Sequence, residues 1–291
     1  MPSLKEVRTR IASVKSTQQI TSAMKMVAAS KLRRAQAGIL QLRPFAGEQK
    51  KLLQQLIAAT GGAKSAYGEE RATNRILYVA FSSNRGLCGA YNSNVIKQTA
   101  GLLAEEANTE TPPALVTIGR KGTEFFAKTP VKVVASYDSL YDRLSYASAV
   151  EVADDLIQLF VSGEYDRVIF IYHRFKNAVV QNLQVEQFLP VEYEHEQPGA
   201  EQEEIEYIFD PSKEEILEEL IPRILKTQFF KALLDAWASE LGARMTAMSQ
   251  ATDNASELLK ELRLTYNKAR QAAITKEILE IVGGAEALKN V

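Results

Sequence analysis

The residues best suited to chemistry in this 291-residue sequence are one cysteine and two histidines, Cys88, His173 and His195. A cysteine becomes a strong nucleophile when a base such as histidine lies beside it and takes its proton. His173 lies in a β-branched and aromatic run typical of a strand, and His195 lies among glutamates, so neither position predicts a base for Cys88. We interpret Cys88 as a small residue packed at a strand-to-helix turn. One cysteine also excludes a disulfide within the chain, and so few soft ligands argue against a zinc-type site.

The loop around Cys88 is the natural place to look for a nucleotide site, because it follows a predicted strand and opens a predicted helix. Its sequence over residues 82–92 is SSNRGLCGAYN, with glycines at 86 and 89. A dinucleotide fingerprint requires G-x-G-x-x-G, and a phosphate loop requires G-x-x-x-x-G-K-[ST]. Neither pattern is present here or in the GRKG of residues 119–122. We therefore predict structural turns, with no catalytic residue, no cofactor and no metal.

Charge is distributed unevenly, although the net charge is only −1. Residues 1–34 contain one acidic residue, Glu6, and eight basic ones: Lys5, Arg8, Arg10, Lys15, Lys25, Lys31, Arg33 and Arg34. Residues 191–206 contain seven glutamates and no Lys or Arg, which indicates a solvated loop. Binding of single-stranded nucleic acid usually needs aromatic side chains among the basic ones, and Phe45 is the first aromatic residue of the chain. The basic segment therefore predicts an acidic protein partner, not nucleic acid.

Two helical seams stand at the two ends of the sequence. Steps of three and four residues keep side chains on one helix face, where a partner helix can cover them. The first seam, which becomes polar or small in its middle, is Leu4, Val7, Ile11, Val14, Gln18, Thr21, Lys25, Ala28, Leu32, Ala35, Ile39 and Leu42. The second seam is Leu234, Ala238, Leu241, Met245, Met248, Thr252, Ala255, Leu259, Leu262, Tyr266, Ala269 and Ala273. The seams predict a long antiparallel coiled coil of N- and C-terminal helices.

The second helix should cover about residues 212–288 and be roughly 110 Å long at about 1.5 Å per residue. A helix of this length cannot lie inside a domain of this size, so we expect it to project and to need partners. Ser212 and Glu215 have the spacing of a capping box at its start. Pro44 and Pro222 are expected to kink the first and second helix.

Between the helices the periodicity changes to that of strands. β-branched and aromatic runs begin near residues 75, 114, 131, 167 and 178, and amphipathic stretches separate the first four. Strands that alternate with helices predict a parallel open sheet, and the alternating pattern of the fifth run indicates a half-exposed strand. We therefore predict a Rossmann-like α/β domain at 74–210, inserted between an N-terminal coiled-coil helix at 1–60 and a C-terminal one at 211–291.

Three stretches resemble the gamma subunit family of bacterial F-type ATP synthases. They are IASVKSTQQITSAMKMVAASKL at 11–32, RGLCGAYN at 85–92, and ATDN at 251–254 with YNKARQAAITKEILEIVGGA at 266–285. In the last stretch the residues that fall at the family's spacing are Ile274, Thr275, Glu277, Glu280, Gly284 and Ala285. The resemblance covers the whole chain in the right order.

The resemblance implies a central rotor shaft without an active site of its own. In that family the shaft turns inside a ring of alternating alpha and beta subunits, and its foot joins the epsilon subunit and the membrane ring of c subunits. Proton flow turns the c ring and the shaft with it. The chain would then be present once per complex, peripheral at the cytoplasmic face of the bacterial inner membrane, and in contact with the membrane only through the c ring.

The resemblance also assigns candidate contact residues. Positions that match beta-subunit contacts of the family are Met24, Lys25, Arg244, Arg270, Gln271, Thr275 and Glu277. Tyr207 and Asp210 match the segment that faces the c ring and epsilon. From the residues alone, two other functions stay open. One is a generic coiled-coil scaffold or homodimer, and the other is a nucleotide-dependent α/β enzyme with a site near residues 85–91.

Overall fold

The computed structural model describes residues 3–59, 67–68, 71, 75–107, 111–142, 144–191 and 213–289. Its elements, in chain order, are α1 (Leu4–Ala59), β1 (Ile76–Phe81), α2 (Tyr91–Glu105), β2 (Ala114–Ile118), α3 (Arg120–Phe126), β3 (Val133–Tyr137), α4 (Tyr146–Val161), β4 (Arg167–Phe175), β5 (Gln181–Leu189) and α5 (Lys213–Lys289). The chain divides into two compact units. The coiled-coil unit comprises residues 1–28 and 245–291, and the sheet unit comprises residues 29–244. None of the described helices has the length and apolar composition needed to cross a membrane.

The two helix segments of the coiled-coil unit run antiparallel. Gln18 Nε2 donates to Ser256 Oγ over 2.7 Å, and Thr252 Oγ1 donates to Thr21 Oγ1 over 2.9 Å. Lys25 Nζ donates to Ser249 Oγ over 2.9 Å. As the residue number rises along α1, the number of the partner falls along α5, which fixes the direction of pairing. The polar middle of the first seam therefore lies against a polar stretch of α5.

The predicted seams are confirmed by burial. Each predicted position on α1 is buried or half-buried except Lys25, and all twelve predicted positions on α5 are buried or half-buried. Both helices continue through the prolines expected to kink them, Pro44 and Pro222. The predicted capping residue Ser212 lies outside the described residues.

The sheet has five strands in the order β3-β2-β1-β4-β5. β1 pairs in parallel with β2 and with β4, and β2 pairs in parallel with β3. β5 is antiparallel to β4. The alternation of strands and helices predicted the parallel part. Only residues 176–180 join β4 to β5, and a link this short can return the chain only in the opposite direction.

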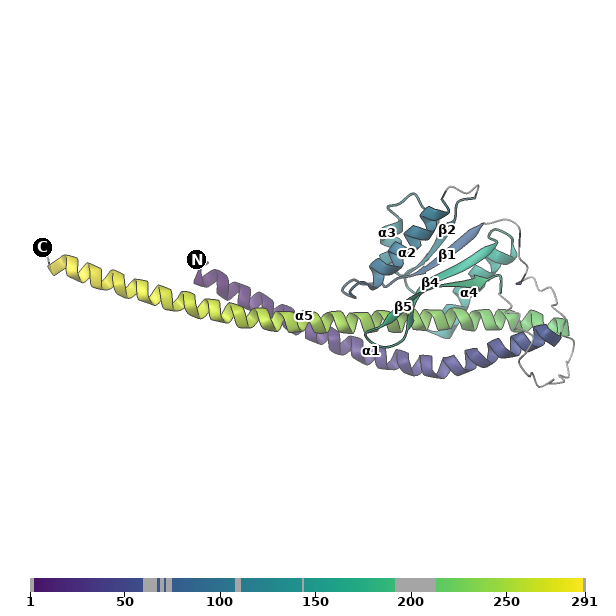
Figure 1. Ribbon diagram of the computed structural model, residues 1–291, viewed down its shortest axis with the longest axis horizontal. Coiled ribbons are helices and arrows are strands. Elements are labelled where there is room, and N and C mark those ends of the chain that lie inside the picture. Colours follow the sequence, from purple (N-terminus) through teal and green to yellow (C-terminus); the bar gives the residue numbers. More distant parts are fainter. Residues whose placement is uncertain are drawn as a thin grey trace. The chain divides into compact units, whose positions relative to one another are not determined.

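Each face of the sheet is covered by helices (Figure 1). Alternate residues of β1 point to opposite faces, and all six are buried. On one face, Leu77, Val79 and Phe81 share a core with α4 and α5; on the other, Tyr78 packs with α2 and α3. This pattern explains why β1 is a continuous apolar run.

Helix α5 contributes directly to the core of the sheet unit. Its residues Ile221, Leu225, Phe229 and Leu233 are at most 1% exposed and belong to the cluster on the α4 face. The ring of Phe229 lies 5.9 Å from that of Phe81. The partner that the helix was expected to need is therefore, for its first third, the sheet face and not the N-terminal helix alone. Its apolar residues there cover a sheet face, which periodicity cannot distinguish from a partner helix.

The turn after β2 depends on Gly119, whose φ of 95° is rarely adopted by other residues. A Cβ added there would lie 2.2 Å from the Ser82 carbonyl oxygen. Ser82 Oγ donates to the Gly119 carbonyl oxygen over 2.8 Å and accepts from the Gly122 N–H over 2.8 Å. The loops that follow β1 and β2 are thus locked together at one edge of the sheet.

Helix α4 begins at a capping box, and its removal gives a testable loss of stability. Ser145 accepts from the Ser148 N–H, and the Ser148 hydroxyl accepts from the Ser145 N–H. Replacing Ser145 with Ala should lower the free energy of unfolding by about 1 kcal/mol because the first-turn N–H loses its acceptor. Ser145→Asp, which keeps an acceptor, should be close to wild type in a urea titration. Equal losses for both variants would contradict the capping role.

Candidate functional site

The ends of β1 and β4 form the position where an open α/β sheet usually binds its ligand. The chain leaves β1 toward β2 on one side and later returns to β4 on the other, so the strand order reverses between them. In the sheet unit α5 occupies this position. Tyr91 OH donates to the Ala236 carbonyl oxygen over 3.0 Å, and Ser239 Oγ donates to the His173 carbonyl oxygen over 2.9 Å. The place of a nucleotide is therefore taken by the protein's own helix.

At this position, burial shifts the pKa values of Cys88 and His173 in the directions that disfavour a reactive thiolate and a histidine base. Cys88 is 2% exposed, and burial raises the pKa of its thiol, so the thiolate form is disfavoured. Its sulfur accepts from Asn92 Nδ2 over 3.2 Å. His173 stacks on Tyr91 with ring centroids 4.6 Å apart, and burial lowers its pKa to about 4. The structure thus supports the interpretation of Cys88 as a packed turn residue, and among the described residues it places no activated base beside this thiol.

The buried His173 should make stability depend on pH. Its pKa is about 4 in the folded chain against about 6.5 in an unfolded one, so the unfolded state binds the proton first as pH falls. The stabilising contribution is complete above pH 6.5 and should be lost between pH 6.5 and 4, by up to about 3 kcal/mol. His173→Phe keeps the ring contact and removes the titration.

The measurement is the free energy of unfolding of both proteins across that pH window. Two carboxyl groups near the site, Asp235 and Glu240, have pKa values raised by burial and act in the opposite direction at the acid end. For this reason the difference between wild type and His173→Phe is compared, not the absolute curve. Parallel curves for the two proteins would show that His173 is not buried in its neutral form.

A series of polar contacts fastens α5 to the rest of the sheet unit. Lys226 Nζ lies 2.8 Å from Asp154 Oδ1 of α4, and Gln228 Nε2 donates to Glu186 Oε1 of β5 over 3.0 Å. Tyr172 of β4 donates to the same carboxylate of Glu186. These contacts add directional restraints to an apolar interface that could otherwise slide, so the helix is held against rotation as well as separation.

An ion pair with the buried carboxylate of Asp235 links α1, α5 and β4. Arg43 Nη2 of α1 lies 3.1 Å from Asp235 Oδ1 of α5 and donates to the Phe175 carbonyl oxygen of β4 over 2.8 Å. The side chain of Asp235 is fully buried, whereas that of Arg43 is 38% exposed. Burial raises the pKa of Asp235 although Arg43 acts in the opposite direction. The ion pair therefore holds both long helices to the sheet.

Arg244, a predicted contact residue, closes this series at the end of the sheet unit. Its guanidinium donates to the carbonyl oxygens of Arg85 and Gly86 and forms an ion pair with Glu240. The side chains of Arg244 and Glu240 are only 11% and 12% exposed. Most of the donor capacity of Arg244 is thus used inside the sheet unit.

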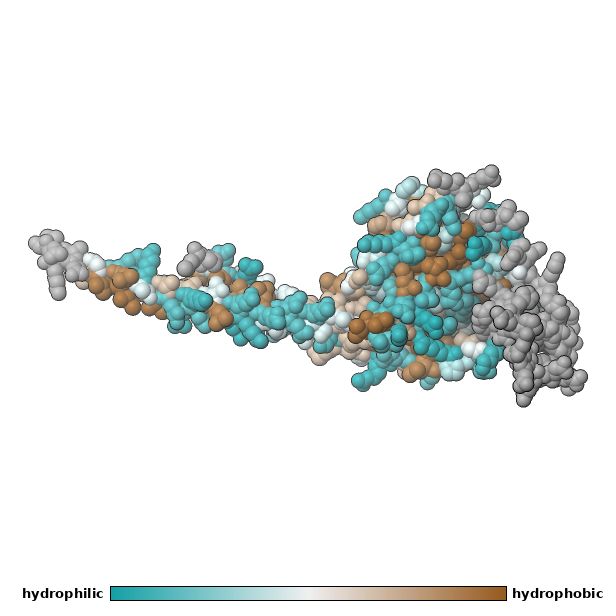
Figure 2. Space-filling model, in the orientation of Figure 1, coloured by the Kyte–Doolittle hydropathy of each residue, from teal (hydrophilic) through white to brown (hydrophobic). Residues whose placement is uncertain are grey.

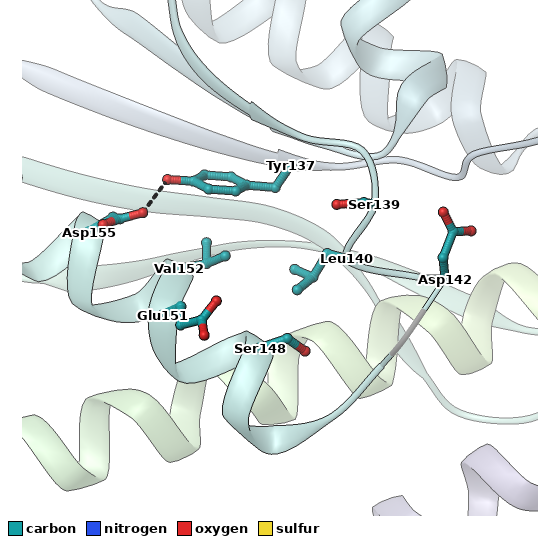
Figure 3. A pocket seen from close by; sticks show the side chains of 8 residues that line it. All are labelled: Tyr137, Ser139, Leu140, Asp142, Ser148, Glu151, Val152 and Asp155. Carbon is teal, nitrogen blue, oxygen red and sulfur yellow. Dashed lines mark hydrogen bonds between the residues drawn. The ribbon is translucent and has the colours of Figure 1, made fainter.

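An open pocket of about 480 Å³ lies between the end of β3 and helix α4 (Figure 3). Its lining residues are Tyr137, Ser139, Leu140, Asp142, Ser148, Glu151, Val152 and Asp155. Tyr137 OH donates to Asp155 Oδ2 over 2.8 Å. Three carboxylates and no Lys, Arg or His among these residues would repel nucleotide phosphates. Within the described part of the chain no group of three His, Cys, Asp or Glu side chains is placed to hold a metal ion.

The other predicted contact residues lie in the coiled-coil unit or outside the described residues. Met24 is half-buried and Lys25 is exposed on α1. Arg270, Gln271, Thr275 and Glu277 are all exposed on α5, where Thr275 Oγ1 donates to the Gln271 carbonyl oxygen over 2.9 Å. Tyr207 and Asp210, predicted for the foot, lie outside the described residues.

The end of α5 exposes apolar side chains without a helix partner in the described chain. α1 begins at Leu4, and the antiparallel register brings Leu4 opposite about residue 270 of α5. Beyond this point large apolar side chains are 45–71% exposed: Ile274, Ile278, Leu279, Ile281 and Val282. Figure 2 shows hydrophobic residues gathered near this end of the helix. A surface of this kind is typical of a contact with another protein.

Sequence reasoning missed the residues that fasten α5. Asp235 is a lone acid in the apolar run ALLDAWA (232–238), and Glu240 and Arg244 are spaced by four on a buried helix face. Both patterns are signals of buried charge that must be paired. Tyr91 carries no such signal, because its partner is a backbone carbonyl oxygen far along the chain.

Comparisons with known proteins agree in one family. The profile of the ATP synthase family matches residues 3–288. The chain is 50% identical over 295 residues to the ATP synthase gamma chain of Cytophaga hutchinsonii, covering 100% of both chains. It is 52% identical over 289 residues to that of Flavobacterium johnsoniae, covering 99% of both.

Among solved structures, the chain resembles one from the central stalk and c ring of the Tetrahymena thermophila mitochondrial ATP synthase. The TM-score is 0.60 and the identity 26%, over 80% of this chain and 99% of that one. A chain of the Euglena gracilis mitochondrial ATP synthase has a TM-score of 0.68 at 19% identity over 98% and 94% of the two chains, which supports the fold alone. The chain therefore belongs to the ATP synthase gamma chain family.

Proposed function

We propose that this chain is the central rotor shaft of an F-type ATP synthase. It is a non-catalytic subunit that couples proton-driven rotation of the c ring to conformational change in the ring of alpha and beta subunits. One observation carries the proposal: α5 is a single helix of 77 residues that supplies core residues of the sheet unit near one end and bare apolar residues near the other. A continuous helix anchored in this way transmits a twist along its length.

The rotor function assigns a task to each of three segments. The helices at 1–60 and 211–291 form the shaft, and the α/β domain at 74–210 is the foot where rotation enters. The side chains between the helices of the coiled-coil unit are small and hydroxylated at Thr21, Thr252 and Ser256, which keeps this part of the shaft slim. A slim shaft with an uninterrupted seam resists twisting and can still turn inside the surrounding ring of alpha and beta subunits.

The shaft must push on the beta subunits at a few directional contacts. Arg270 and Gln271 match the family positions that hydrogen-bond the catch loop of beta, and Thr275 and Glu277 lie nearby on the same exposed part of α5. The planar fork of an arginine suits this task because it binds a carboxylate at two points.

In the family, a second contact of the shaft is with an acidic segment of the beta subunit, here called the lever. Met24, Lys25 and Arg244 match positions near this segment. The exposed basic residues of the N-terminal helix, among them Lys15 and Lys25, complement that lever in charge. Because the guanidinium of Arg244 is engaged inside the sheet unit, we expect its part in this contact to be indirect.

The foot is expected to bind the epsilon subunit and the c ring, with Tyr207 and Asp210 as contact candidates. The chain would then sit at the cytoplasmic face of the bacterial inner membrane as a peripheral subunit, in one copy per complex. It would touch the membrane only through the c ring.

The geometry favours the rotor over the other two functions. A nucleotide-dependent enzyme needs an open site, but α5 occupies the end of the sheet between β1 and β4, and the pocket beside α4 is acidic. A homodimeric scaffold needs a free seam, but the seam of α1 is already covered by α5 of the same chain.

Co-purification tests the proposed function directly. A tagged copy of this chain, expressed in its own cells and extracted with mild detergent, should bring down alpha, beta, epsilon and c subunits, with three beta subunits for each tagged chain. The purified chain alone should not hydrolyse ATP. Recovery of a homodimer without beta, or ATP hydrolysis by the isolated chain, would contradict the rotor function.

A further inference from the structure

We propose that Glu240 and Arg244 are positioning residues for rotation: they form a latch that locks the loop after β1 onto α5, so that the foot and the helix turn together. This inference rests on the proposed rotor function. The latch consists of the two side chains and the backbone carbonyl oxygens of Arg85 and Gly86. The structure assigns the role of Glu240 through geometry.

The guanidinium of Arg244 makes contacts in two directions. Its Nη2 donates to the Arg85 carbonyl oxygen over 3.1 Å, and its Nη1 donates to that of Gly86. Its Nε donates to Glu240 Oε1 over 2.8 Å. A rigid fork held at one side by a carboxylate presents its remaining N–H groups in a fixed direction. Glu240 therefore aims Arg244 at the loop.

Because Glu240 is buried, its carboxylate depends on the ion pair with Arg244. Glu240 is 9% exposed as a residue, on a helix whose neighbouring positions Ser239 and Leu241 are buried. A buried carboxylate requires a partner, because leaving it unpaired is far costlier than at the surface. The described chain contains a matched pair that lacks this feature: Glu219 and Arg223, also four residues apart on α5, have side chains 81% and 65% exposed.

The loop itself needs to be held. Leu87 has φ of 66°, a left-handed conformation that non-glycine residues adopt at a cost, and its side chain is 65% exposed. A strained residue with no packed side chain persists only when its neighbours hold the backbone. On one side the carbonyl oxygens of Arg85 and Gly86 bind Arg244; on the other Cys88 is buried against Asn92.

The position of the latch gives it a mechanical role. Arg244 is the last residue of α5 within the sheet unit. Any rotation of α5 about its own axis would carry Arg244 away from the two carbonyl oxygens. The hydrogen bonds thus oppose rotation of α5 relative to the sheet unit at Arg244. If α5 slipped there, part of each rotation of the foot would not reach the rest of the helix.

Cys88 is a built-in reporter of the latch, since it is the chain's one cysteine and lies next to the latched loop. In the full-length chain, Glu240→Gln removes the charge that aims Arg244 but keeps the size of the side chain. The charge of Glu240 also raises the pKa of Cys88, so the rate constant is compared for the thiolate form, corrected for the thiol titration of each variant. We expect this rate constant for a thiol reagent to increase about tenfold to a hundredfold, as for loss of a charge-assisted hydrogen bond. Glu219→Gln should leave the rate unchanged. An unchanged rate in Glu240→Gln would overturn the latch.

The readout of rotation uses the assembled, membrane-bound complex. With Glu240→Gln, proton pumping per ATP hydrolysed should fall at least twofold, while ATP hydrolysis by the detached catalytic part stays within error of the Glu219→Gln control. Normal pumping together with fast Cys88 labelling would show that the latch exists but carries no twist, and would overturn its positioning role. Failure of the wild-type chain to assemble with beta would instead contradict the proposed function, and the thiol rates of the full-length chain would still report on the latch.

Discussion

Replacing Arg43 with Met is expected to lower the free energy of unfolding of the chain by about 3 kcal/mol at pH 7.5. Arg43 pairs with Asp235, whose carboxylate is fully buried, so the variant leaves a buried charge without its cation. It also frees the Phe175 carbonyl oxygen that Arg43 binds. The partial exposure of Arg43 places the expected loss at the lower end of the range for broken buried pairs.

The charge of Asp235 can be isolated by a second substitution and by pH. Arg43→Met with Asp235→Asn should recover most of the loss, because the neutral amide does not need a cation. In Arg43→Met alone, the folded-state pKa of Asp235 should rise further above its unfolded value. The penalty should therefore be small near the unfolded pKa and grow as pH rises through the folded one.

The measurement is urea unfolding of the full-length chain at several pH values. Arg223→Met, at an exposed pair on the same helix, should change the free energy of unfolding by less than about 0.5 kcal/mol. A loss in Arg43→Met that is equal at all pH values, or not recovered by Asp235→Asn, would show that packing and not charge is responsible.

Replacing Arg270 with Ala is expected to reduce coupled ATP synthesis by about tenfold or more while leaving the isolated chain folded. Arg270 is exposed on α5, so its removal should change the chain's own stability by less than about 0.5 kcal/mol. In the complex it is proposed to bind a carboxylate of the beta subunit at two points, and a charge-assisted bond of this kind contributes about 1.5–3 kcal/mol.

The experiment compares ATP synthesis by membranes that carry each variant. Arg263→Ala removes an exposed arginine two helical turns earlier and should behave as wild type. Arg270→Lys keeps the charge but not the fork and should give an intermediate rate. Full synthesis by Arg270→Ala in a normally assembled complex would mean that this residue does not make the proposed contact.

The sequence was most informative where a pattern repeats over many residues. Steps of three and four predicted the seams because a long helix can cover such a stripe only with another surface, and burial follows the stripe from Leu4 to Ala273. The strands were predicted because their runs are β-branched and bounded by turns. The antiparallel direction of β5 came only with the structure. It depends on the short link between β4 and β5, whose length is known only once the ends of both strands are known.

The junction between α5 and the sheet could not be predicted in the same way. Its contacts join a side chain to a backbone carbonyl oxygen, as in Tyr91 to Ala236 and Arg244 to Arg85, and such pairs leave no trace in residue type or spacing. The part of α5 that covers the sheet has the same apolar period as the part that covers α1. For this reason the sequence predicted a projecting helix that needs partners but did not show that the sheet is one of them.

For the candidate contact residues, the sequence motif identified positions but not the contacts that each side chain makes within the chain. The family motif placed Arg244 among the contacts, but only the structure shows that its guanidinium is committed to Glu240 and a loop. Arg270 and Glu277, in contrast, are exposed on α5, as partner contacts would be.

Rotation of this chain inside its complex is the most direct test of the account. A bead attached to Val179→Cys at the exposed β4–β5 link, in a Cys88→Ser background, would follow the foot while the catalytic ring is fixed to glass. With ATP, the account predicts rotation in one direction with three pauses per turn, one for each beta subunit. A bead that stays still or fluctuates without direction while the same complexes hydrolyse ATP would contradict the central claim that this helix pair is a shaft that carries torque.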